Sequence, residues 1–229
     1  MFKSHASSLL DRLPNTHGRF HLPAYVLDAL SSGDIVQDFE FDQILPPRFR
    51  AISDEHWSSV EAAYAIIQMI KDSSVKTFVD LGAGPGKLSL LLALMSDLEI
   101  TAIERRRNLV EIGRKICEAN APERVRFIHG DLFDLDWGAF DVLYLFNPFL
   151  EHTCGPLEVI DQNIALGRKS YNKSVGSAFR HLCLLNSGQR VITFHGYGGR
   201  MPDSLKLVRS ARVGAGTMKM WEQSSREKA

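Results

Sequence analysis

Hydrophobic and polar residues follow two regular patterns along most of the chain. Short apolar runs predict strands at residues 75–81, 99–103, 125–128, 140–146 and 190–194, with an antiparallel pair at 205–211 and 217–221. Apolar positions three and four residues apart predict helices at 88–95, 109–116 and 171–185. Because strands alternate with helices and are apolar on both faces, the pattern predicts an α/β fold. Its parallel sheet is doubly wound and covered by helices on both faces.

The first part of the chain has a different pattern. Four prolines interrupt short apolar runs within the first 50 residues, which predicts short helices and loops. From Ser53, a capping hydroxyl followed by two carboxylates predicts the start of one helix that continues to about Met69. We therefore expect residues 1–70 to form a helical segment that packs on a core domain of residues 71–229.

Composition excludes several classes of protein. The 229 residues include 27 Lys and Arg and 27 Asp and Glu, so the formal net charge is zero. This balance argues against a protein that coats nucleic acid or binds a membrane surface. No apolar run approaches the ~18 residues of a membrane span, and the N-terminus lacks a signal-peptide layout, so we expect a soluble, cytoplasmic protein. Three widely spaced cysteines indicate neither a disulfide framework nor a zinc site.

Candidate chemistry lies just after the predicted strands, because ligands of parallel sheets bind at the carboxyl ends of the strands. The first strand leads through Asp80 into a turn with three glycines, Gly82–Gly86, where a ligand could approach the backbone closely. The dinucleotide-binding fingerprint requires glycine where Lys87 stands. Asp80 would also repel a pyrophosphate. The turn therefore favours a ligand that carries positive charge and no phosphate, although Asp80 could instead cap the following helix.

Acidic residues follow the second and third strands. Glu104 could accept hydrogen bonds from both hydroxyls of a ribose, although a solvated surface glutamate is the alternative. Asp131 could accept a hydrogen bond from an adenine amine, with Leu132 or Phe133 packed on the ring. At the fifth strand's end, His195 could line a substrate pocket as a base or be a hydrogen-bonded structural histidine.

In this order, the motifs after four successive strands resemble the class I S-adenosylmethionine-dependent methyltransferases over residues 75–221. The resemblance implies a seven-stranded sheet with an antiparallel last strand, and S-adenosylmethionine as the cofactor. It implies that Asp80 and the glycine turn hold the methionine part, Glu104 the ribose and Asp131 the adenine. The residues expected at the cofactor are Asp80, Gly82, Ala83, Gly84, Gly86, Glu104, Arg105, Gly130, Asp131, Leu132 and Asn147.

The acceptor site is expected after the fourth strand. Asn147-Pro148-Phe149 is similar to the Asn/Asp-Pro-Pro-aromatic motif of enzymes that methylate amines of nucleobases or glutamine, without the second proline. An Asn followed two positions later by Phe also resembles the non-SET histone-lysine methyltransferases, but the chain lacks a long basic tail for docking a nucleosome. The resemblance implies that Asn147 positions the acceptor, with Pro148, Phe149 and His195 at the substrate. We expect the acceptor atom to be a nitrogen of a protein side chain or a small molecule, because the charge balance gives no strong nucleic-acid signal.

Two other functions remain open for this fold. A nicotinamide-dependent oxidoreductase would need a glycine at position 87 and a hydride-transfer set, and neither is evident. A non-catalytic nucleoside-binding module would keep the glycine turn but lose the Asn-Pro-Phe edge, whereas this chain has both.

Overall fold

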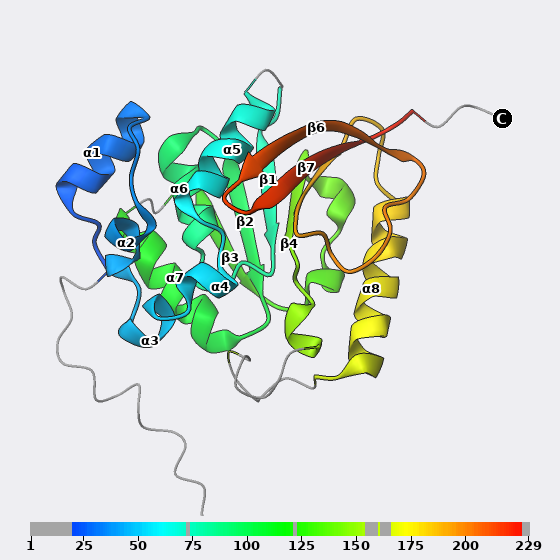
Figure 1. The fold of residues 1–229 in the computed structure, drawn as a ribbon, viewed down its shortest axis with the longest axis horizontal. Helices are drawn as coiled ribbons and strands as arrows, with labels where there is room; N and C mark the ends of the chain where they lie inside the picture. Colours follow the sequence, from blue (N-terminus) through cyan, green and yellow to red (C-terminus); the bar gives the residue numbers. More distant parts are fainter. Residues whose placement is uncertain (1–19, 72–73, 121–122, 154–159, 161–165, 226–229) are drawn as a thin grey trace, which may run out of the picture.

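The computed structural model describes residues 20–71, 74–120, 123–153, 160 and 166–225. Its centre is a seven-stranded sheet with the strand order β3-β2-β1-β4-β5-β7-β6 (Figure 1). The first five strands are parallel, and β7 runs antiparallel to both β5 and β6, which confirms the predicted sheet. The strands are β1 (Thr77–Leu81), β2 (Glu99–Glu104), β3 (Val125–His129), β4 (Val142–Phe146), β5 (Arg190–Phe194), β6 (Leu205–Val213) and β7 (Gly216–Gln223).

Helices cover both faces of the sheet, as predicted (Figure 1). On one face lie α5 (Val60–Ile70), α6 (Lys87–Met95) and α7 (Arg107–Asn120), with α1 (Ala24–Ser32) packed on α6. On the other face lies α8 (Arg168–Cys183). Alternate residues of each strand enter one of two apolar clusters, because successive side chains of a strand point to opposite faces.

Strand β1 lies at the centre of the fold and determines where a ligand can bind. It pairs with β2 on one side and β4 on the other, so the strand order reverses beside it. A crevice at the carboxyl ends of the strands is expected at such a switch point. At one end of the strand order, β6 pairs with β7 through a register shift between Leu207 and Arg209.

The segment before the sheet is helical, but the predicted helix from Ser53 to Met69 is wrong in one respect. It is interrupted at Trp57, whose backbone is extended, and α5 begins only after Ser59, whose side chain accepts a hydrogen bond from the Ala62 N–H at 3.1 Å. Trp57 is apolar and fits the helical spacing, so periodicity alone could not reveal the break. The short helices before the sheet are α2 (Asp38–Phe41), η1 (Asp42–Ile44), α3 (Pro47–Arg50) and α4 (Ser53–His56). Three more lie between the strands: η2 (Leu132–Asp134), η3 (Trp137–Ala139) and η4 (Leu150–His152).

Two smaller observations concern the length of the apolar helices and the cysteines. Within the described ranges, no helix combines the length and the apolar character that crossing a membrane requires. Cys117 lies on the buried face of α7, and burial raises the pKa of its thiol well above the usual value. Cys154 lies outside the described residues.

Candidate functional site

A cavity of about 370 Å³ lies at the carboxyl ends of the central strands. We call it the larger cavity, and a neighbouring one of about 80 Å³ the smaller cavity. Both are lined by Gly82 after β1 and Glu104 at the end of β2, so one ligand could reach from one to the other. Of the predicted site residues, the larger cavity is lined by Gly82, Gly84, Glu104, Asn147, Pro148 and His195. The smaller is lined by Gly82, Glu104, Arg105, Gly130, Asp131, Leu132, Pro148 and Phe149.

The three glycines of the turn, Gly82, Gly84 and Gly86, all have positive φ. Gly84 has φ +57°, and a Cβ at this position would clash with the indole ring of Trp57. Gly86 has φ +78°, but a Cβ there would meet the ring of Phe127 beneath α6. Gly86 therefore allows the helix to pack closely and lines neither cavity, and its direct contact with the cofactor stays a prediction.

Glu104 joins the glycine turn to the end of β2. Its buried carboxylate accepts hydrogen bonds from the Gly84 N–H at 3.1 Å and from the Arg106 N–H at 2.8 Å, one on each oxygen. A carboxylate oxygen has two lone pairs, so each can accept a further hydrogen bond from a ligand. Glu104 thus lies where the sequence predicts it, although it also stabilises the turn.

An ion pair that the sequence did not predict lies where the two cavities meet. Arg106 contacts Glu151 of η4 at 2.6 Å and Glu104 at 3.6 Å, and these residues line both cavities. Burial, and secondly the charges of Arg105 and Arg106, lower the pKa of the neighbouring His152. Arg106 and Glu151 are 45 residues apart, and no pattern in the sequence indicates that the loops after β2 and β4 meet.

Asp80 was expected at the ligand, but its side chain is buried against α6. It accepts a hydrogen bond from the Ser89 hydroxyl of α6 at 2.7 Å, and neither Asp80 nor Ala83 lines the larger or the smaller cavity. Burial raises the pKa of Asp80 to about 7, the Ser89 hydrogen bond opposes this rise, and the charge of Glu104 adds to it. The backbone N–H of Ala83 donates to Ile103 at 2.9 Å and holds the turn against β2. Contact between Asp80 and a cofactor ammonium group stays a prediction.

The residues that follow β3 line the smaller cavity. Asp131 caps η2 by accepting a hydrogen bond from the Phe133 N–H at 3.0 Å. The rings of Phe133 and Phe149 stack with 5.9 Å between their centroids, and Phe149 is only 4% exposed. Phe149 lines the smaller cavity and His195 the larger, so the structure does not bring these two predicted substrate residues together in one cavity. The chain turns after Asn147, whose carbonyl accepts a hydrogen bond from the Leu150 N–H at 3.0 Å.

Asn147 and His195 have an unusual backbone conformation. Among the described residues other than glycine, these two have positive φ, +38° and +57°. They directly follow the neighbouring strands β4 and β5, and the Asn147 N–H donates to the Gly196 carbonyl at 3.0 Å. Such conformations cost about 1–3 kcal/mol each and concentrate at functional sites. Both residues line the larger cavity, beside His56 and Trp57 of the N-terminal segment.

The fold and the position of this site at the carboxyl ends of the strands are similar to those of class I, Rossmann-like methyltransferase domains. Residues 78–163 match the methyltransferase domain family. The chain is 34% identical over 73 residues to the ribosomal RNA small subunit methyltransferase G of Zymomonas mobilis, covering 32% of this chain and 33% of that protein. It is 30% identical over 147 residues to the tRNA1(Val) (adenine(37)-N6)-methyltransferase of a Shewanella species, covering 60% and 57%. The chain thus spans between a third and somewhat over half of the length of these relatives.

Solved structures share the fold. An RNA methyltransferase from Salinibacter ruber, in complex with S-adenosyl-L-homocysteine, matches with a TM-score of 0.50 and 21% identity over 72% of this chain and 92% of that one. TrmN from Thermus thermophilus matches with a TM-score of 0.54 and 17% identity over 72% and 49%. The matches to family, relatives and structures confirm the predicted class of domain, and they agree with the predicted enzyme class and cofactor.

The prediction about the acceptor partner is wrong. A protein or small-molecule acceptor without nucleic acid was expected, but the relatives are named as methyltransferases of ribosomal and transfer RNA. Net charge was misleading because it averages over the whole chain. Residues 162–202, which include α8 and β5, contain no Asp or Glu, and their basic residues are Arg168, Lys169, Lys173, Arg180, Arg190 and Arg200.

Proposed function

We propose that this protein transfers a methyl group from S-adenosylmethionine to a nitrogen atom of an RNA base. One observation carries the proposal: the larger cavity brings together the glycine turn, Glu104 and the strained Asn147 at the carboxyl ends of β1, β2 and β4. Its volume of about 370 Å³ lies within the range of small-molecule sites, roughly 300–1,000 Å³.

The donor set fits the cofactor. Glu104 is placed to accept hydrogen bonds from the ribose hydroxyls, since it lines both cavities. The smaller cavity suits the adenine, with Asp131 near its edge and Leu132 and Phe149 as apolar walls. The methionine part would lie along the backbone of the turn at Gly82 and Gly84. When bound, the cofactor supplies an electrophilic methyl group on a positively charged sulfur.

The protein's own contribution to catalysis is mainly alignment. The backbone of Asn147 is held by its hydrogen bond to Gly196 and by the following Pro148, so its amide is kept in one direction. The amide oxygen would accept a hydrogen bond from the acceptor amine and leave the nitrogen lone pair free to form the new N–C bond. The electron pair of the broken C–S bond stays on sulfur. The proton of the amine passes to water or to His195, which lines the same cavity.

Helix α8 supports an RNA acceptor. Arg168, Lys169 and Lys173 are exposed in its first two turns, and no acidic residue lies on the helix. Ser174, on the same helix, lines the smaller cavity, so the basic surface lies beside the site. Lysine and arginine supply most of the phosphate contacts that position a nucleic acid. An RNA acceptor also accords with the cytoplasmic location expected from the sequence.

The test offers methyl-labelled cofactor and the protein to separate RNA, protein and small-molecule fractions of a cell extract. We expect label in RNA that nuclease releases as an N-methylated nucleoside. Label in the protein or small-molecule fraction would contradict the RNA acceptor. Binding of NAD in place of S-adenosylmethionine would favour an oxidoreductase, and cofactor binding without any transfer would favour a binding module. N186A is the matched control for Asn147, because Asn186 lies before β5, at the opposite end of the strand from His195.

A further inference from the structure

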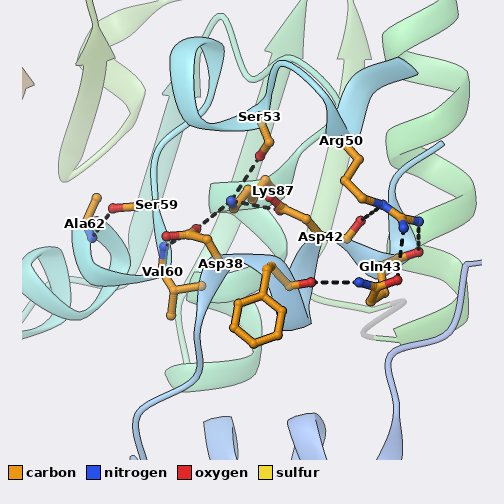
Figure 2. A network of polar contacts seen from close by, with 10 residues as sticks. Asp38, Asp42, Gln43, Arg50, Ser53, Ser59, Val60, Ala62 and Lys87 are labelled. Carbon is orange, nitrogen blue, oxygen red and sulfur yellow. Dashed lines mark hydrogen bonds and ion pairs between the residues drawn. The ribbon is translucent and has the colours of Figure 1, made fainter. Parts of the chain in front are cut away.

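Lys87 is a buried cation that the proposed reaction does not use. Its side chain is 1% exposed, and it is the one charged residue of α6. Its Nζ lies 2.6 Å from Asp38, 2.8 Å from Asp42 and 3.1 Å from the Ser53 hydroxyl, as Figure 2 shows. We call these four residues the Lys87 cluster. A buried charge is strongly unfavourable unless it is paired, so these partners are required for Lys87 to occupy this place.

The position of Lys87 in α6 increases its need for negatively charged partners. It is the first residue of α6, where the partial positive charge of the helix N-terminus disfavours a cation. Two carboxylates offset both this repulsion and the burial. Removing the charge of Lys87 would leave the buried Asp42 carboxylate beside Asp38 without a cation between them, which favours exposure of both to water and weakens the contact of α2 and η1 with α6.

The partners of Lys87 all come from the N-terminal segment. Asp38 is in α2, Asp42 in η1 and Ser53 begins α4. Asp38 also accepts a hydrogen bond from the Val60 N–H at 3.0 Å, so the cluster includes the start of α5 (Figure 2). Short helices separated by up to 22 residues are thereby joined to one point on the core.

That point adjoins the proposed cofactor site. Lys87 directly follows the glycine turn, and the residues after Ser53 form one side of the larger cavity: Asp54, Glu55, His56 and Trp57. Trp57 packs over Gly84, and its ring meets that of Phe49 edge-on with 5.8 Å between centroids. The Lys87 cluster is therefore the polar connection between this side of the cavity and the turn.

We propose that Lys87 is a positioning residue of the cofactor site, which holds residues 53–57 against the glycine turn so that the larger cavity has its closed form. The inference rests on the proposed function and deepens it. Lys87 acts through Ser53 and the aspartates and touches no cofactor atom. A purely structural role would affect stability and leave cofactor affinity unchanged.

The experiment compares K87M, which keeps an unbranched apolar stem, with K87R, which keeps the positive charge. Calorimetry measures Kd for S-adenosylhomocysteine, and acrylamide quenching measures the exposure of Trp57. Each variant is also made with W57F, so the difference in fluorescence isolates Trp57 from Trp137 and Trp221. R190M is the matched control, because it removes the Arg190–Glu222 ion pair (2.9 Å) between β5 and β7, away from the larger cavity.

We expect K87M to weaken S-adenosylhomocysteine binding at least tenfold and to increase quenching of Trp57, while kcat at saturating cofactor changes less than threefold. K87R should recover most of the affinity, and R190M should change neither readout. If K87M folds poorly, D42N, which leaves the Lys87–Asp38 pair, should give an intermediate loss of affinity.

Unchanged Kd and unchanged quenching in K87M, or equal losses in R190M, would overturn the inference. Failure of the wild-type protein to bind S-adenosylhomocysteine would instead contradict the proposed function. In that case the quenching of Trp57 alone decides whether Lys87 holds residues 53–57 in place.

Discussion

The raised pKa of Asp80 makes cofactor binding depend on pH in a direction that can be calculated. Burial raises the pKa of Asp80 to about 7, so the carboxyl group is largely protonated in the free protein below that pH. If Asp80 interacts with the ammonium group of the cofactor, binding favours the ionised form and releases a proton. Affinity is then fully present above pH 7 and lost as the pH falls through 7.

The expected size of the effect follows from the fraction of Asp80 that is ionised. The apparent Kd scales as one plus the ratio of protonated to ionised carboxyl, which is about 2 at pH 7 and about 11 at pH 6. Kd for S-adenosylhomocysteine should therefore increase roughly fivefold between pH 7 and pH 6. Below pH 6, the increase in Kd should approach about tenfold for each further pH unit. The ligand's α-amino group, with an ordinary pKa of about 7.7–8.0, stays charged over this range.

Calorimetry between pH 5.5 and pH 7, in buffers with different ionisation enthalpies, measures both Kd and the protons released. The isosteric variant D80N should bind more weakly at pH 7 and show no fall in affinity below it. Because His56 and His195 line the larger cavity, H56Q and H195Q are measured as controls. A Kd that is constant in the wild-type protein, or a slope that persists in D80N and disappears in a histidine variant, would refute the assignment to Asp80.

Three further variants test other parts of the site. E104A should weaken the binding of S-adenosylmethionine and of its demethylated product equally, by about 1.5–3 kcal/mol, because both contain the same ribose. A strong difference between the two ligands in calorimetry would place Glu104 near the sulfur instead. N147A should lower the methyl-transfer rate by roughly 10²–10⁴-fold with little change in cofactor Kd, and N147D should retain part of the rate; normal turnover at saturating cofactor would contradict this. G86A should lower the melting temperature, since its methyl group would clash with Phe127 and overpacking costs about 1–3 kcal/mol; an unchanged melting curve would show that α6 can shift.

The fold could be predicted because each strand and helix of the core carries its own pattern. The strands β1, β2, β4 and β5 are buried along almost their whole length, as a sheet covered on two sides requires. The pair after β5 is marked by glycines at its turn. Glu104 and Asn147 could be predicted for a related reason, since parallel strands place the residues that follow them at one edge. These inferences depend on position along the chain and require no knowledge of distant contacts.

The missed features depend on contacts between distant segments. Lys87 was read as a missing glycine, whereas its burial depends on carboxylates 45 and 49 residues earlier in the chain, at Asp42 and Asp38. Trp57 fits a helical pattern although its backbone is extended there, because it packs over the glycine turn. One sequence feature did indicate a buried ion pair: α6 begins with the charged Lys87 but is otherwise almost wholly apolar.

The position of β6 at the end of the strand order has a consequence for aggregation. Its outer edge has no neighbouring strand among the described residues, and its exposed side chains include the apolar Leu207 and Val208. An exposed apolar edge can pair with a second molecule and extend the sheet. Here Lys206, Arg209 and Arg212 are interspersed along the same strand, and the register shift at Leu207 and Arg209 makes it irregular. A second copy would bring the same positive charges to the contact, so electrostatic repulsion opposes pairing between the β6 edges of two molecules.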